Sequence, residues 1–599
     1  MDYNDPKQLG GYLSGLIDKF DQSEDSTRTA RENAERDVDY YDGKQWTDKE
    51  AETLRKRGQP IIAHNMIKPR IDFLRGLERS QRSDPVALPR TPSHEQEAHA
   101  ATDALRYVDD AAHYDGTRSD VWSDMLKAGW GGVEVVAEPS ASGEYDIAIR
   151  RCPWDRMFWD PASGANDFSD AAYLGLVVWM DREQAIRTYG ADAAPVFDET
   201  VATSSVGNTY DDKPKLARWV DKARQRVRVI QMYHVGDDGQ WRLCEFTRGG
   251  ILRAMVSPWL DENQEPTHPY VWRSLHVDRE NNRYGAVRML VDPQDETNKR
   301  RSKFLHLINA RQTFGVKGMV GENVLDLRKE MARPDGHVSM EPGSEFGKHF
   351  GVIPTGDMAT GQFQLLQQTM QDLAQMGPNA AMMGRGASSA SGRSVIAQQQ
   401  GGIIEADPSL DEIRSMDLFV YRAAWNRVRQ FWTAEKWVRV TDDENNLKWV
   451  GINVPVTDEL GQVVQVQNQI AGLDVDIIIA DAPDTPTLQG EQFAELASLA
   501  QAGVVFPPEI YIRASNLRNK SELMRVLQEQ SQPPQQDPAM AEMQMRGVNA
   551  EIADKEAGAM QKAASARKTN AEANTVEAQQ MALLAQISGP AAVPGPLMQ

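Results

Sequence analysis

Residues 281–432 constrain the fold of this chain more than any other segment does. Two stretches with helical periodicity flank a compact insert, and a Gly- and Ser-rich segment and a long third helical stretch follow them. Two amphipathic helices joined in this way bury their apolar stripes by folding back on each other. The order therefore predicts an antiparallel helical hairpin, although such hairpins also occur in ordinary helical bundles.

The first helix of this hairpin is predicted from Pro293 to Phe314. Asp292 suits its N-cap, and proline suits a first turn because its missing N–H would have no helical partner there. Phe304, Leu307 and Ile308 recur at steps of three and four residues, so they form one apolar stripe.

The insert, residues 315–356, holds a predicted short helix at Val324–Met331 between turns marked by Gly and Pro. The return helix, residues 357–377, carries its own apolar stripe. Residues 378–393 have no periodicity and are rich in Gly and Ser, so they are predicted to be a loop.

The long helix that follows is predicted over residues 394–433. Pro408 predicts a kink or a restart, because it removes a backbone donor. The second half is amphipathic, and we expect its apolar face to pack against a β-rich region. The residues of that face are Ile413, Met416, Val420, Ala424, Val428, Phe431 and Trp432. Arg422, Arg427 and Arg429 fall elsewhere on the helix and are predicted to lie on a solvated face.

The first 280 residues read as mixed helix and strand. A lead-in helix is predicted within residues 8–36, and Thr47 with Glu50 forms the capping-box pattern of a helix at Asp48–Arg57. An extended segment is predicted at Pro85–Pro89. Residues 194–223 are predicted to be a polar loop, and three strands separated by Gly-rich turns at 236–239 and 249–250 indicate a β-meander.

Charge and motif content exclude several classes of protein. Lys plus Arg is 66 and Asp plus Glu is 87, so the net charge of −21 argues against a surface that grips DNA phosphates. Two cysteines, Cys152 and Cys244, cannot build a disulfide framework, which indicates a reducing compartment. No Walker loop or nucleophile elbow is present. Asp474, Asp476, Asp481 and Asp484 form an acidic group that is better interpreted as the end of a strand than as a metal site.

Several short motifs, taken in their order, resemble those of bacteriophage portal proteins of the short-tailed-phage branch. They include Tyr41–Trp46, Gln59-Pro60 and Asn65 near the N-terminus, then Gly129–Gly132, Asp160-Pro161, Asp167, Asp170 and Ala171. Near and after the first hairpin helix they are Tyr284-Gly285, Asp292–Gln294, Asn298-Lys299, Ser302, Ser391-Gly392 and Gln398–Gly401. None of them is specific alone, but their order and spacing are.

The resemblance implies an α+β portal fold with a defined division of the chain. The implied parts are an N-terminal wing (1–280), a first stem helix (281–314), a clip (315–356), a second stem helix (357–377), a tunnel loop (378–393), a long kinked helix (394–433), a β-rich return to the wing (434–486), a helical crown (487–530), and a linker with a barrel-like C-terminal helix and a disordered tail (531–599).

The resemblance also implies site residues by their position in these parts. The tunnel loop would present Met382, Met383, Arg385, Ser388, Ser389, Ser391 and Arg393 to DNA. The stem would carry Lys299, Arg300, Arg301 and Lys303, and the clip would dock the packaging motor through Arg328, Lys329, Glu330 and Arg333. Contact between DNA and the arginines of the long helix is the lesser alternative to their solvated interpretation.

The implied function is a dodecameric ring at one capsid vertex, through which double-stranded DNA enters and leaves without sequence-specific contacts. The implied partners are copies of the chain, the terminase motor, tail adaptors, and the capsid and scaffolding proteins, with no membrane, cofactor, metal or enzymatic activity. The protein would reside in the virion, and in the host cytoplasm during assembly. The alternatives are another ring-forming head-tail adaptor, or a metal-dependent enzyme using Asp474, Asp476 and Asp481.

Overall fold

The computed structural model divides the chain into two compact units, residues Met1–Glu491 and Gln492–Gln599. The structure describes residues 6–80, 82, 84–90, 95–140, 143–203, 219–221, 224–309, 312–316, 324–333, 335–345, 347–353, 356–376, 392–441, 447–457, 463–470, 475–479 and 507–514, with the single positions 493, 496, 499, 500, 527, 562, 565 and 568. The predicted C-terminal helix, linker and tail lie outside the described residues except for three of these positions.

The described part of the first unit mixes helices and strands, as predicted. Its helices are α1 (Pro6–Ser26), α2 (Arg28–Tyr41), α3 (Asp48–Lys56), α4 (Ile67–Ser80), α5 (Glu95–Ala112), α6 (Tyr114–Lys127), α7 (Arg182–Tyr189), α8 (Ala193–Thr203), α9 (Arg288–Asn309), α10 (Val324–Ala332), α11 (Gly356–Gln375) and α12 (Gly392–Phe431). In the second unit, α14 (Pro508–Ala514) is described. None of the described helices is long and apolar enough to span a membrane.

Two antiparallel sheets form the centre of the first unit. One has the order β12 (Tyr270–Ser274), β2 (Trp130–Pro139), β3 (Tyr145–Cys152). The other runs β4 (Met157–Trp159), β5 (Tyr173–Asp181), β7 (Arg226–Val235), β8 (Trp241–Thr247), β9 (Gly250–Val256), with β6 (Val220–Asp221) also paired to β7. The strands β7, β8 and β9 are the predicted meander, which the pairing confirms.

Two-stranded ribbons complete the described strands. They are β1 (Pro85–Pro89) with β21 (Val475–Ile479), β10 (Trp259–Leu260) with β11 (Pro266–Thr267), β13 (His276–Val277) with β14 (Arg283–Tyr284), β15 (Gln312–Gly315) with β16 (Phe350–Ile353), β17 (Lys436–Thr441) with β18 (Leu447–Ile452), and β19 (Val454–Thr457) with β20 (Val463–Gln467). The pairing of β1 with β21 joins segments almost 400 positions apart in the sequence.

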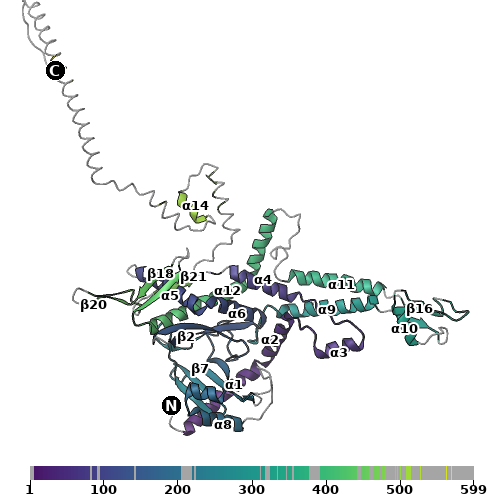
Figure 1. Ribbon diagram of the computed structural model, residues 1–599, viewed down its shortest axis with the longest axis horizontal. Coiled ribbons are helices and arrows are strands. Elements are labelled where there is room, and N and C mark those ends of the chain that lie inside the picture. Colours follow the sequence, from purple (N-terminus) through teal and green to yellow (C-terminus); the bar gives the residue numbers. More distant parts are fainter. Residues whose placement is uncertain are drawn as a thin grey trace, which may run out of the picture. The chain divides into compact units, whose positions relative to one another are not determined.

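The long helix α12 packs across the first sheet and the ribbons, and Figure 1 shows it bent near the body of the unit. Pro408 lies inside it and lacks the N–H that a helix needs at that position. The predicted apolar face is confirmed: Ile413, Met416, Val420, Ala424, Val428 and Trp432 are all buried. They belong to the largest core, together with residues of α5, α6, β2 and β3.

Local capping signals were reliable in the N-terminal part. Thr47 accepts a hydrogen bond from the Glu50 backbone, and the Glu50 carboxylate accepts one from the Thr47 backbone, so the predicted capping box is present. The lead-in helix is also present as α1, and Leu16 and Phe20 from its apolar side are buried in the core under the larger sheet.

Two predictions at the level of elements are wrong. The first hairpin helix begins at Arg288 rather than Pro293 and ends at Asn309, so Asp292 is not its N-cap. Pro293 is the sixth residue of this helix, where it removes the backbone donor that would otherwise pair with the Met289 carbonyl. The predicted loop at 194–223 includes α8, whose Phe197 is buried under the sheet.

A buried ion network fastens α12 to the helices beneath it. The Arg118 guanidinium bonds Glu78 of α4 at 2.5 Å and Asp417 of α12 at 2.7 Å, and the Tyr114 hydroxyl donates to Asp417 at 2.7 Å. Burial opposes the charge, yet the two carboxylates raise the pKa of Arg118 above its ordinary value. The network therefore satisfies charges that would be costly in isolation.

Replacing Arg118 by methionine should destabilise the chain by about 3–5 kcal/mol, because it leaves Asp417 buried without its cation and leaves Glu78 paired with Arg82 alone. Arg182→Met is the matched control, since Arg182 pairs with Asp198 at the surface and such pairs contribute at most about 1 kcal/mol. Denaturant unfolding of the two variants measures the difference. Equal effects would contradict the structural role of the network.

A second carboxylate below α12 links stability to pH. The Tyr421 hydroxyl donates to Asp109 at 2.9 Å, and burial, with added repulsion from Asp115, Asp110 and Asp84, raises the Asp109 pKa to about 7. The unfolded carboxyl has a pKa of about 4. The folded state therefore loses stability as pH rises from about 4 to 7.

Asp109→Asn should remove this loss while keeping an oxygen that accepts from Tyr421. We expect a stabilisation on the order of 1–2 kcal/mol at pH 8 and a much smaller one at pH 5. Both values are reduced from the full effect of the pKa shift because the carboxyl is partly accessible to solvent. Thermal unfolding of both proteins at the two pH values tests this. A gain of the same size at both pH values would show that Asp109 does not titrate in this window.

Candidate functional site

The helices α9 and α11 form the hairpin that the sequence predicts. Figure 1 shows them side by side, projecting from the body of the unit, with β16 and α10 at their far end. The rings of Phe304 and Phe363 meet between them with centroids 5.4 Å apart. The strands β15 and β16 pair in antiparallel register: Gln312 lies opposite Ile353, and Gly315 lies opposite Phe350. This pairing joins the two ends of the insert.

A row of buried polar side chains on α9 forms hydrogen bonds with the backbone of an extended segment of the N-terminal region, residues 59–66. Gln294 donates to the His64 carbonyl at 2.7 Å and accepts from the Met66 amide at 2.9 Å. Asn298 accepts from the His64 amide at 2.9 Å. Since residues 59–66 belong to no helix or strand, these side chains satisfy backbone groups that would otherwise be unpaired.

The same row reaches further residues of the sequence motifs. Asn298 donates to Gln45 at 2.7 Å, and the Ser302 hydroxyl donates to the Pro60 carbonyl at 2.6 Å. Asn65 donates to the Tyr41 carbonyl at 2.9 Å and accepts from the first amides of α4. The motif residues that are far apart in sequence therefore meet in one hydrogen-bonded network at the base of the hairpin.

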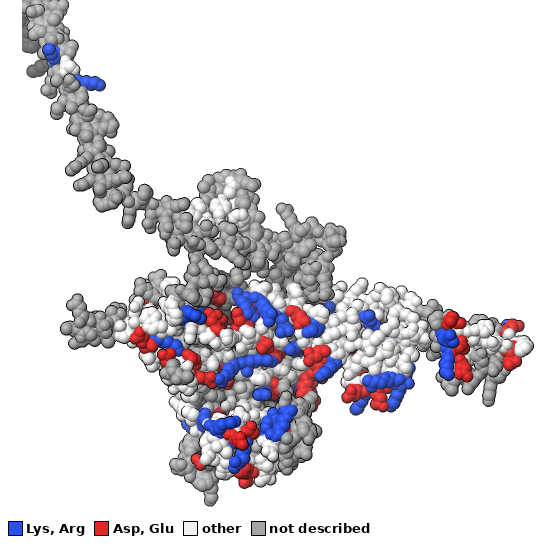
Figure 2. Space-filling model, in the orientation of Figure 1, with Lys and Arg blue, Asp and Glu red and all other residues white. Residues whose placement is uncertain are grey.

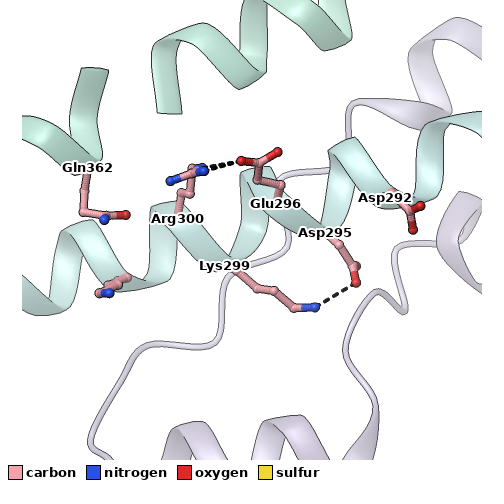
Figure 3. Close-up of a pocket in the computed structure, with 7 residues that line it drawn as sticks. Asp292, Asp295, Glu296, Lys299, Arg300 and Gln362 are labelled. Atoms are coloured by element: carbon pink, nitrogen blue, oxygen red, sulfur yellow. Dashed lines mark hydrogen bonds and ion pairs between the residues drawn. The ribbon is translucent and has the colours of Figure 1, made fainter. Parts of the chain in front are cut away.

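The predicted stem cations lie on the other faces of α9, around an open hollow of about 490 Å³. Figure 3 shows Lys299 paired with Asp295, and Arg300 paired with Glu296. Lys299 also reaches Glu50 of α3 at 3.3 Å. Although burial opposes its charge, these acids raise the Lys299 pKa. Lys303 lines the hollow, which Gln362 of α11 completes, and Arg301 is half-buried.

The insert places the four predicted docking residues in α10 or directly after it. Lys329 pairs with Asp326 at 3.3 Å, and Arg333 pairs with Glu330 at 3.2 Å, both at the surface. Arg328 lies in α10, directly before Lys329. The insert therefore offers an exposed surface with charges of both signs.

The predicted tunnel-loop residues lie mostly outside the described residues. Met382, Met383, Arg385, Ser388, Ser389 and Ser391 all fall in 377–391, and Arg393 is at the start of α12. Asp474, Asp481 and Asp484 are outside the described residues too. Asp476 lies in β21 and bonds Arg90 at 2.9 Å. Among the described residues, no cluster of three or more His, Cys, Asp or Glu could hold a metal ion.

The solvated interpretation of Arg427 is wrong. Its side chain is 1% exposed, donates to the carbonyls of Val135 and Leu260 at 3.2 and 2.8 Å, and stacks against Trp259. Burial lowers its pKa to about 10. The periodicity of α12 could not reveal this, because the acceptors come from β2 and β10. Arg422 and Arg429 are half-buried.

Sequence reasoning missed Arg283, which is fully buried next to the Tyr284-Gly285 motif. It donates to Ser274 at 2.8 Å and to Ser163 and Ala165 at 3.0 Å, and it lies 4.0 Å from the centroid of the Phe168 ring. Asp170 holds the same loop by accepting from Ser163, Gly164 and Ala165. The loop that contains the Asp160–Ala171 motif thus supplies the acceptors for Arg283. The loop and the arginine are more than 100 positions apart in the chain, so the sequence gave no sign of this contact.

Comparison with protein families bears on this arrangement. Residues 17–585 match the family described as Phage P22-like portal protein, a range that includes the hairpin, the insert, both sheets and α12. Comparison with individual curated proteins finds no match. Portal proteins are structural components of the phage capsid vertex. The chain therefore belongs to the P22-like family of phage portal proteins.

Proposed function

We propose that twelve copies of this chain form a ring at one vertex of the phage capsid, and that viral DNA is packaged and later ejected through its central channel. The observation that carries the proposal is the hairpin of α9 and α11 with its small insert, followed in the chain by the long α12. Membership of the portal family supports assigning these elements to stem, clip and the helix after the tunnel loop.

In this proposal the described elements divide the work. The sheets and helices of residues 1–280, with the return at 434–486, form the wing. The hairpin encloses the channel, and residues 315–356 form the clip. The terminase motor docks on the clip and supplies the work of packaging, and tail adaptors later occupy the same surface. The capsid and scaffolding proteins contact the wing. The tunnel loop at 378–393 remains part of the proposal without a described structure.

The two earlier alternatives fare differently. A separate head-tail adaptor no longer fits, because the family match spans nearly the whole chain. The acidic-site enzyme loses support at Asp476, because its carboxylate is held by Arg90 through two guanidinium nitrogens. We therefore propose a passive conduit that performs no chemistry.

The purified chain should form rings with a central hole in negative-stain electron microscopy. A chain truncated after Pro538 should form them as well, because the described core elements all precede that residue. If the full chain formed rings and the truncated chain did not, the C-terminal segment would be shown to drive assembly. Monomers of both chains, even with scaffolding protein added, would contradict the ring.

The clip surface can be tested by charge reversal. Lys329→Glu with Arg333→Glu should leave rings intact, because both side chains are largely exposed. Like charges introduced into a docking surface cost several kcal/mol, so binding of the terminase should weaken by about tenfold or more. Arg182→Glu in α7 is the control for added negative charge. Unchanged terminase affinity would remove these residues from the docking surface.

A further inference from the structure

The return helix α11 has an unusual distribution of side chains around its axis. Leu366, Thr369 and Leu373 are buried and mark the face toward α9. On the opposite face, exposed residues follow at steps of four, three and four, which place them on one stripe. The residues of this stripe are the glutamines Gln364, Gln368, Gln371 and Gln375, and one exposed acid, Asp372, lies beside it, four positions after Gln368.

The stripe is flanked by exposed apolar residues on both sides. Phe363, whose ring also meets Phe304 of α9, is 42% exposed on one flank, and Leu365 and Met376 are 41% and 36% exposed on the other. Two apolar flanks on one helix suit contacts with neighbours to the left and right, as a closed ring of identical hairpins requires. The glutamine stripe between the flanks then has no neighbouring hairpin to pack against.

The two helices of the hairpin differ in their content of charged residues. Between Gly356 and Gln375, α11 contains no Lys or Arg, and its acids are Asp357 and Asp372. The exposed lysines of the hairpin, Lys299 and Lys303, belong to α9, where Lys299 and the half-buried Arg300 are paired with acids. Figure 2 shows the surface over α11 as mostly white, whereas mixed charges cover the body and the tip of the insert.

The layering of the hairpin sets which side is free. The segment at 59–66 and α3 cover α9 through the polar row and the contact between Lys299 and Glu50. In Figure 1, α11 lies on the side of α9 away from α3. The glutamine stripe therefore faces away from the N-terminal region as well as from α9.

We propose that the stripe Gln364, Gln368, Gln371 and Gln375 is the surface along which the DNA duplex slides, an inference that rests on the proposed ring. A lysine or arginine that contacts phosphate displaces counterions and binds strongly at low salt, which would arrest a moving duplex. A neutral amide offers a donor of modest net strength, which water replaces at little cost. Copies of the stripe around the ring would keep the duplex centred without holding it.

The test introduces cations into the stripe with the double variant Gln368→Lys and Gln371→Lys. Ring formation should persist, because both side chains are exposed. In DNA packaging assays at low salt, the variant should be slower by roughly tenfold or more, and the rate should recover as salt is raised, since phosphate contacts weaken with salt. The control is Gln184→Lys with Gln240→Lys, which adds the same charge at exposed sites of the wing.

Other outcomes would overturn the proposal. Packaging by the stripe variant at the wild-type rate, or slowing that salt does not relieve, would show that the stripe does not contact the phosphates. Loss of rings in the stripe variant alone would identify the stripe as a contact between subunits. If the unmodified chain forms no rings, it is the proposed ring itself that fails.

Discussion

The hairpin depends on the buried polar row of α9, since two isolated helices with narrow apolar stripes are only marginally stable in water. Gln294, Asn298 and Ser302 are fully buried, and each would be costly without a partner. Their partners are backbone groups of an extended segment that has no strand of its own. The side chains of α9 and the backbone of the extended segment therefore satisfy each other's hydrogen-bonding groups. The base of the hairpin cannot shift without breaking several of these hydrogen bonds together.

Buried arginines repeat this arrangement elsewhere in the first unit. Arg118 joins two helices through carboxylates, whereas Arg283 and Arg427 are held mainly by carbonyl oxygens and aromatic faces. A guanidinium has five fixed donors, so one side chain can bridge several segments. Two of these three arginines connect α12 to other elements: Arg118 pairs with Asp417 of α12, and Arg427 belongs to α12. The long helix is thereby fixed to the sheets over much of its second half.

The sequence predicted what depends on neighbours along the chain. The capping box at Thr47, the meander, the short helix of the insert and the apolar face of α12 are set by local propensity and periodicity, and the structure has them. The start of α9 was missed because Asp292 and Pro293 imitate an N-terminus that a turn near Gly285 provides earlier. The helix α8 was missed because its polar surroundings outweighed a short apolar pattern.

The candidate site was less accessible to sequence reasoning. Order and spacing pointed to Gln294, Asn298 and Ser302 as motif residues, but their role depends on partners more than 200 positions away. The burial of Arg427 and Arg283 depends in the same way on carbonyls from distant segments. Arginine on a helix normally extends to water, so only tertiary structure reveals the exceptions.

The two helices of the hairpin are unlike because they face different surroundings. In α9, Lys299 and Arg300 are paired with acids one turn away, and Lys299 also reaches Glu50 of α3. The side-chain amides of Gln294 and Asn298 form hydrogen bonds with the N-terminal segment. The helix α11 has few ionic groups, and the glutamine stripe on its free face is neutral, with Asp372 beside it, in a chain whose net charge is −21. A strongly acidic face would repel a duplex and a basic face would bind it, so neutrality is the composition that permits motion in both directions.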